Sequence, residues 1–274
     1  PNMSAIYNNP TFLRMYWRAL QELVNGPLTV ANSGPLLDAK FNTFTANGIS
    51  VENPSASIKP WLTQAHDSIA SQLAAVNAAS FTVNSSVTVS NNVAYVSGVA
   101  PVNVVAVWIN GMAYPLTWTS LTGWTVAVPL VNGNNSFTMT GVDRNDQPIA
   151  GASGSANVNY NGAPVSPVGQ VVINEIMYAP ATAGGEFVEL YNNSTNTAFD
   201  LSGWSVNGLS YTFPTGSLIG PTNYLVLAAN PTAYATAYGA TAPVFDTFGG
   251  TLSANGETLT LNTSNGVAVA KVKY

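Results

Sequence analysis

The chain has 274 residues, enough for two or three domains that each bury a core of their own. Only 7% of the residues are charged and the net charge is -5, so the sequence offers no basic footprint for nucleic acid or anionic membrane surfaces. It contains no cysteine, which excludes disulfides and thiolate chemistry, and no apolar run approaches the roughly 20 residues of a membrane-spanning helix. So sparsely charged a surface is typical of an extracellular or cell-surface protein without membrane insertion.

The first 80 residues are expected to contain three helices. The first runs from about Pro10 to Val24, with Asn9 as its N-cap and Pro10 at the first helical position. The second covers Ser33 to Phe44, and the third, Ser57 to Ala79, carries an apolar stripe at helical spacing. The three could form a small bundle, although the polar loop before the third helix is long for one.

The same region also shows a family resemblance. It reads N-P-T-F-L-R-M-Y-W-R-A-L-Q-E-L-V-N-G-P-L (Asn9 to Leu28), then a second helix, then I-K-P-W and a helix ending near S-Q-L. This order resembles the closing part of the CotH-type spore-coat kinase domain, a distant relative of protein kinases. The resemblance implies that nucleotide and metal ligands lie earlier in such a domain. No glycine-rich phosphate loop or catalytic Asp/Asn pair precedes Pro10, so we expect no catalytic residue and no nucleotide cofactor in this chain.

From Phe81 the hydrophobic period changes from 3.6 to 2, which predicts strands. The candidates are NNVAYVSGVA, NVVAVWING, MAYPLTWTS, GWTVAVPLVNG, NSFTMTGVD and SANVNY, with Asn110-Gly111 and Asn132-Gly133 expected as two-residue hairpin turns. The runs V-W-I-N-G, G-W-T-V-A-V-P-L and N-G-N-N-S-F-T-M-T-G-V-D-R-N-D-Q resemble small immunoglobulin-like modules of secreted bacterial glycan-active enzymes and adhesins. We therefore expect an immunoglobulin-like sandwich at residues 81–160, followed by a Pro- and Gly-containing linker at residues 161–169.

Residues 170–274 predict a second sandwich of six or seven short strands. They include VVINEIMY, GGEFVELYNNS, FDLSGWSVNG with a hairpin at Asn207-Gly208, TNYLVLAAN, ETLTLNTSNG and VAVAKVKY. INEIMY, EFVELYN, D-L-S-G-W and G-E-T-L-T-L in this order resemble the lamin tail domain, an immunoglobulin-like family also found in large secreted bacterial proteins. The resemblance implies a non-catalytic, surface-association role. The expected fold class is mainly β: two immunoglobulin-like β-sandwiches in tandem, preceded by a short helical segment (residues 1–80) that ends a CotH-like domain.

One loop is a candidate calcium site. Asp143, Asn145 and Asp146 in GVDRNDQP could supply the carboxylate and amide oxygens that calcium prefers. The favoured alternative is an Asx turn between two strands, where Asp and Asn bind the backbone.

Three tryptophans are a candidate ligand platform. Trp108, Trp118 and Trp124 are a dense aromatic set, and exposed aromatic rings bind sugars. The favoured alternative is that they pack in the core, and Trp204 in D-L-S-G-W is expected in the core of the second sandwich.

Two further groups of ionisable residues are candidates for chemistry. Glu175 and Glu189, with Glu186 nearby, lie at matching positions of two strands, and a structural role is favoured over catalysis because no histidine or nucleophile accompanies them. His66 is the only histidine, which excludes multi-histidine zinc sites, and it is expected on the solvated side of the third helix.

The sequence predicts a non-catalytic structural or adhesive part of a secreted or cell-surface bacterial protein. The expected partners are other protein subunits or surface glycan, or further copies of the chain in a homo-polymer built through strand edges. The alternative is the accessory C-terminal region of a secreted CotH-like kinase or hydrolase whose catalytic part lies upstream. Because the chain opens on Pro1-Asn2 without a signal peptide, we expect it to be a piece of a longer precursor.

Overall fold

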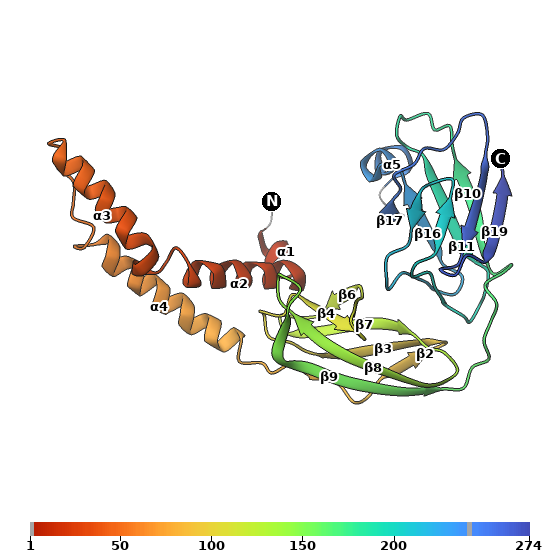
Figure 1. Cartoon of the computed structure of the whole chain (residues 1–274), viewed down its shortest axis with the longest axis horizontal. Coiled ribbons are helices and arrows are strands. Elements are labelled where there is room, and N and C mark those ends of the chain that lie inside the picture. Colours follow the sequence, from red (N-terminus) through yellow and green to blue (C-terminus); the bar gives the residue numbers. More distant parts are fainter. Residues whose placement is uncertain (1–2, 240–242) are drawn as a thin grey trace.

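The computed structural model describes residues 3–239 and 243–274 (Figure 1). Helices α1 to α4 form an arm that projects from the first of two β-sandwiches, and the second sandwich follows at the other end of the chain. The predicted fold class, mainly β with a short helical segment in front, is confirmed.

The helical arm consists of α1 (Met3–Tyr7), α2 (Pro10–Asn25), α3 (Val30–Ala46) and α4 (Ile58–Val76). The three predicted helices are present, and the second begins three residues earlier than expected. Asn9 caps α2 as predicted, because its Oδ1 accepts hydrogen bonds from the backbone N–H of Thr11 (3.0 Å) and Phe12 (3.3 Å).

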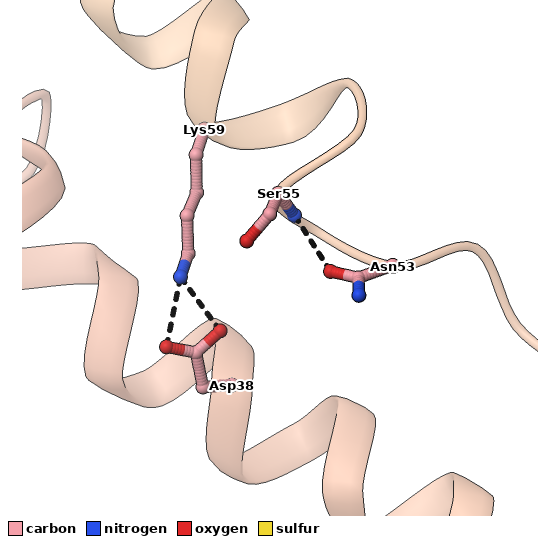
Figure 2. Close-up of polar contacts among 4 residues, drawn as sticks. All are labelled: Asp38, Asn53, Ser55 and Lys59. Carbon is pink, nitrogen blue, oxygen red and sulfur yellow. Dashed lines mark hydrogen bonds and ion pairs between the residues drawn. The ribbon is translucent and has the colours of Figure 1, made fainter.

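Helices α3 and α4 form a hairpin that is fixed near its α4 start by polar contacts (Figure 2). The Lys59 ammonium lies 2.7 Å and 2.8 Å from the two carboxylate oxygens of Asp38. Ahead of α4, the Asn53 side chain accepts the Ser55 N–H at 2.9 Å, which turns the chain into the helix. The arm stays elongated instead of closing into a compact bundle, and its buried apolar residues, among those described, are Val24, Pro54, Leu62 and Leu73.

The first sandwich packs two antiparallel sheets face to face around a core of alternating apolar residues. Its strands are β1 (Thr82–Val83), β2 (Thr88–Ser90), β3 (Val93–Val99), β4 (Ala106–Ile109), β5 (Met112–Ala113), β6 (Leu116–Trp118), β7 (Gly123–Pro129), β8 (Gly133–Val142) and β9 (Pro148–Tyr160). One sheet has the order β1-β3-β7-β6 with β2 beside β3, and the other has the order β5-β4-β8-β9.

Of the two hairpins predicted in this sandwich, one is confirmed and one is wrong. Asn110 and Gly111 join β4 to β5 with φ of 51° and 81°, as a tight turn of this type requires. Asn132-Gly133 instead lies where the chain crosses from one sheet to the other, because β7 pairs with β3 and β6 whereas β8 pairs with β4 and β9. The Asn135 side chain fixes this crossing by accepting the Val131 N–H at 2.9 Å and donating to the Val131 carbonyl at 2.8 Å.

In the residues that the structure describes, the second sandwich has ten strands, more than the six or seven predicted, and it also has a helix, α5, that was not predicted. The elements are β10 (Val171–Met177), β11 (Phe187–Asn192), β12 (Phe199–Asp200), β13 (Ser205–Asn207), β14 (Tyr211–Thr212), β15 (Leu218–Ile219), β16 (Tyr224–Ala228), α5 (Pro231–Tyr238), β17 (Val244–Thr247), β18 (Thr258–Asn262) and β19 (Ala268–Lys273). Sheets β10-β11-β16-β17 and β14-β13-β18-β19 enclose the core, and β12 pairs with β15. The predicted turn at Asn207-Gly208 joins β13 to β14, but it extends to Ser210, and the positive φ angles fall on Gly208 and Ser210.

The missed helix α5 changes the direction of one strand pair. Asn230 caps it by accepting the N–H groups of Thr232 (2.9 Å) and Ala233 (3.1 Å), and Pro231 occupies its first position. A helical crossover lets the chain return in the same direction, so β16 and β17 pair in parallel while the other strand pairs of this sandwich are antiparallel.

Candidate functional site

The guanidinium of Arg14 on α2 ties the helical arm to the first sandwich. Its Nη2 donates to the carbonyls of Pro101 and Val104, both at 2.7 Å. Its Nη1 donates to the carbonyls of Ala100, at 3.3 Å, and Leu121. Arg14 is fully buried, so the four carbonyl oxygens at this end of the sandwich face a charged donor instead of water.

The same side chain covers an aromatic ring. The Arg14 Cζ atom lies 3.5 Å from the centre of the Trp118 ring, a cation–π contact that burial strengthens. Burial, and to a smaller extent the charge of Arg18, lower the pKa of Arg14 to about 9. Because carbonyl oxygens accept from the charged form, Arg14 remains a cation at neutral pH.

A second contact between the arm and the first sandwich lies beside this one. Glu22 on α2 forms an ion pair with Arg144 in the β8–β9 loop. Both side chains are more than half exposed, so the pair contributes little stability. Both residues line a cleft between α2 and the loop that carries the candidate calcium residues.

The candidate calcium residues lie in a tight turn of this loop. Asp143 Oδ1 accepts the backbone N–H of Asn145 at 2.8 Å and of Gln147 at 2.9 Å, which is the geometry of the Asx-turn alternative. Asp146 follows with φ of 58°. Within residues 3–239 and 243–274, no group of three or more His, Cys, Asp or Glu residues is placed to hold a metal ion. The calcium assignment stays a prediction, and one Asp143 oxygen is already committed to the backbone.

The three candidate platform tryptophans do not form one surface. Trp124 is 1% exposed and stacks on Phe81 in the core, so it is closed to a ligand. Trp118 faces Trp124 across β6 and β7, and the guanidinium of Arg14 covers it. Trp108 is half-buried on β4, in the other sheet. Trp204 lies in the core of the second sandwich at 6% exposure, as predicted.

The two sandwiches are joined by a reciprocal hydrogen-bonded pair. The side chain of Asn92, just before β3, donates to the Ala198 carbonyl at 2.8 Å and accepts the Ala198 N–H at 2.7 Å. Beside this pair, the two sandwiches and the segment 162–165 line a cleft of about 300 Å³. The segment between β9 and β10 therefore passes along a formed junction.

A second point of contact between the sandwiches is a close approach at Gly216. This residue has φ of 81°, and a Cβ built on it would lie 2.3 Å from Pro115 Cδ of the first sandwich. Burial raises the pKa of the neighbouring Tyr114, and the charge of Asp200 from the second sandwich raises it further. Among the described residues, the two sandwiches thus make contact at Gly216 as well as at Ala198.

The paired glutamates occupy opposite positions on β10 and β11. Glu175 and Glu189 are register partners, and a bulge after Ile173 turns Glu175 outward, away from the face that simple alternation predicts. Asn174 donates to Glu189 Oε1 at 2.7 Å. Burial of Tyr234 raises its pKa, and the charges of Glu189 and then Glu175 raise it further. His66 lies elsewhere, on α4, and its Nδ1 is 2.9 Å from Asp67 Oδ1.

Comparison with known proteins identifies the second sandwich. Residues 164–274 match the family model of the Lamin Tail Domain. No curated protein matches the chain. In the part of the chain that the structure describes, no helix is long and apolar enough to cross a membrane. A lamin tail domain is an immunoglobulin-like interaction or structural domain, which agrees with the resemblance carried by INEIMY and D-L-S-G-W.

The sequence did not reveal the residues that join the helical arm, the first sandwich and the second sandwich. In the sequence, Arg14 is one polar residue within a predicted helix, and the carbonyls that accept its hydrogen bonds lie 86 to 107 residues away. Asn92 binds a backbone group 106 residues away. Contacts at such separations leave no local pattern. Helix α5 did leave one, because Asn230-Pro231 repeats the Asn9-Pro10 signal that begins α2.

Proposed function

We propose that this chain is a non-catalytic structural or adhesive part of a secreted or cell-surface bacterial protein. It mediates interactions with protein or glycan, or takes part in surface assembly. The family match over residues 164–274 supports the interaction role, and a surface covered mainly by Asn, Ser, Thr and Gly supports the extracellular location.

The observation that carries this proposal is the junction between the two sandwiches. Two reciprocal hydrogen bonds between Asn92 and Ala198, and the close approach of Gly216 to Pro115, fix one sandwich against the other. A fixed junction holds the surface of each sandwich at a constant distance and orientation from the next. Such an array suits a role in presenting binding surfaces.

The test is to force the junction apart and measure the shape of the molecule. Gly216→Ala adds a Cβ that clashes with Pro115, so small-angle X-ray scattering should show a larger maximum dimension and a broader distance distribution. Gly266→Ala is the matched control, because Gly266 has nearly the same φ, 83°, and no atom within 4 Å of the added Cβ. The control shares the backbone strain but not the clash, and should scatter like wild type.

A second variant probes the hydrogen bonds alone. Asn92→Ala removes both bonds to Ala198, whereas Asn84→Ala removes an exposed bond to Ser97 within the first sandwich. Asn92→Ala should broaden the distribution and Asn84→Ala should not. Wild-type scattering that already requires a freely jointed pair of sandwiches would overturn the rigid array.

A further inference from the structure

Helix α2 packs one apolar side inward, where Leu13, Trp17 and Leu20 are partly buried and Val24 is buried, and it leaves a second apolar side exposed. Phe12, Met15, Tyr16 and Leu23 recur at helical spacing and are 41% to 51% exposed. Arg14, on the opposite side of the helix, is the residue buried against the first sandwich. Amphipathic helices normally bury their apolar residues, so the exposed side of α2 is an apolar surface without a partner in the described part of this chain.

The uncovered face is large for a single chain. The four exposed residues, here named the α2 stripe, continue onto Tyr7, whose ring meets Tyr16 edge-on at 5.8 Å. With large side chains burying about 150–250 Å² each, five that are roughly half exposed present on the order of 400 Å². An apolar patch of this size marks an interaction site. Pairing two such patches removes about 800 Å² from water before flanking residues are counted, and a stable interface needs about 1,200 Å² in total.

The charges of the arm favour a second copy of the same surface as the partner. Residues 1–80 contain four basic and four acidic residues, whereas residues 81–274 contain three basic and eight acidic residues. The net charge of -5 therefore lies on the sandwiches, and two arms meet without repulsion while two sandwiches repel. Lys59–Asp38 and Arg144–Glu22 are already paired within the chain, so these charges need no partner from outside.

We propose that the α2 stripe binds the α2 stripe of a second copy in a two-fold symmetric dimer. A two-fold axis places the same apolar surface on both sides, and Phe, Met, Tyr and Leu side chains interdigitate as ridges in grooves. This inference deepens the proposed interaction role by naming one partner and the surface that binds it. The outward sandwiches of both copies then remain open to other ligands.

The experiment is sedimentation velocity on the full chain over a concentration series up to ~100 μM. Wild type should show a reversible monomer–dimer equilibrium. Phe12→Ser with Tyr16→Ser should raise the dissociation constant at least about tenfold, with unchanged circular dichroism. Tyr95→Ser is the matched control, since Tyr95 on the first sandwich is 44% exposed, like Tyr16, and should leave the equilibrium unchanged.

Two results would overturn the dimer. One is a wild-type chain that stays monomeric throughout the series, and the other is a dimer that survives the double substitution. A monomer that binds uncharged phosphatidylcholine vesicles through the α2 stripe would reassign this surface to lipid. The scattering test of Gly216→Ala is independent of these outcomes, so failure of the dimer and failure of the rigid array are distinguishable.

Discussion

The second sandwich buries its large apolar side chains in one core, whereas the helical arm leaves those of the α2 stripe exposed. The sandwich encloses 19 buried hydrophobic residues in one core, with Trp204 and Leu261 among them. Among the described residues of the arm, Val24, Pro54, Leu62 and Leu73 are the buried apolar residues, and the α2 stripe is exposed. The sandwich is therefore stabilised by its own core, whereas the position of the arm depends on a polar contact with another part of the chain. The predictions that follow test this difference.

The largest expected effect is on the core of the second sandwich. Trp204→Ala removes a side chain that is 6% exposed and should cost about 3 to 5 kcal/mol through lost burial and the cavity left behind. Hydrogen exchange of β10 and β11 in increasing urea measures the loss. The matched control is Trp61→Ala in α4, which truncates a ring that is 60% exposed and should change stability by less than about 0.5 kcal/mol. If the two substitutions lowered the stability equally, burial would not distinguish the second sandwich from the arm.

A smaller and more local effect is expected at the contact that holds the arm. Arg14→Met keeps an unbranched apolar stem but leaves four carbonyl oxygens without their donor, at a cost of about 1–3 kcal/mol. The amides of α2 should exchange faster while those of β10 and β11 are unchanged. Arg144→Met, which removes only the exposed pair with Glu22, should have little effect. Faster exchange throughout the first sandwich would mean that Arg14 supports the sandwich itself and not only the docking of the arm.

At neutral pH, the smallest expected effect on stability is that of substituting Tyr211. At alkaline pH this substitution should change the stability of the second sandwich more strongly. Burial and the hydrogen bond from Tyr211 Oη to Asp246 Oδ2, at 2.8 Å, raise the pKa of Tyr211 above its usual value. Folding therefore favours the protonated phenol. The contribution of Tyr211 to the free energy of unfolding is complete below pH of about 10 and is lost as the pH rises further. The denaturant midpoint of the second sandwich should fall above pH 10 in wild type and fall less in Tyr211→Phe.

Part of that alkaline decline should persist in the variant. Burial and the bond to Glu257 raise the pKa of Tyr274 to about 12, so its contribution is lost between pH of about 10 and 12. The arm offers an internal comparison, because hydrogen exchange of α3 and α4 should not follow the titration of these two tyrosines. Identical alkaline profiles for wild type and Tyr211→Phe would show that the bond to Asp246 does not stabilise the sandwich.

Local patterns predicted the elements, and contacts between distant residues set their arrangement. The alternation from Phe81 onward and the cap at Asn9 were sufficient for strands and for α2, because both depend on neighbours in sequence. The hairpin prediction at Asn132-Gly133 was wrong, because the same dipeptide also suits a crossing between sheets. Which of the two forms depends on the strands that β7 and β8 pair with, and these lie in different sheets. The helix at Pro10 was predicted correctly, but the exposure of Phe12, Met15 and Tyr16 on it follows from the docking of Arg14 onto carbonyls far along the chain.

The first and last strands of the second sandwich determine how it would respond to mechanical load. Strands β10 and β19 lie side by side in different sheets, and the rings of Tyr178 and Tyr274, just beyond their ends, are 5.0 Å apart. The segment from the first sandwich enters at one end of this pair, and Tyr274 lies at the other end (Figure 1). A pull applied between Asn161 and Tyr274 would therefore run along β10 and β19. The ladders β10–β11 and β18–β19 would then be loaded in shear, so that their hydrogen bonds resist together instead of opening one at a time.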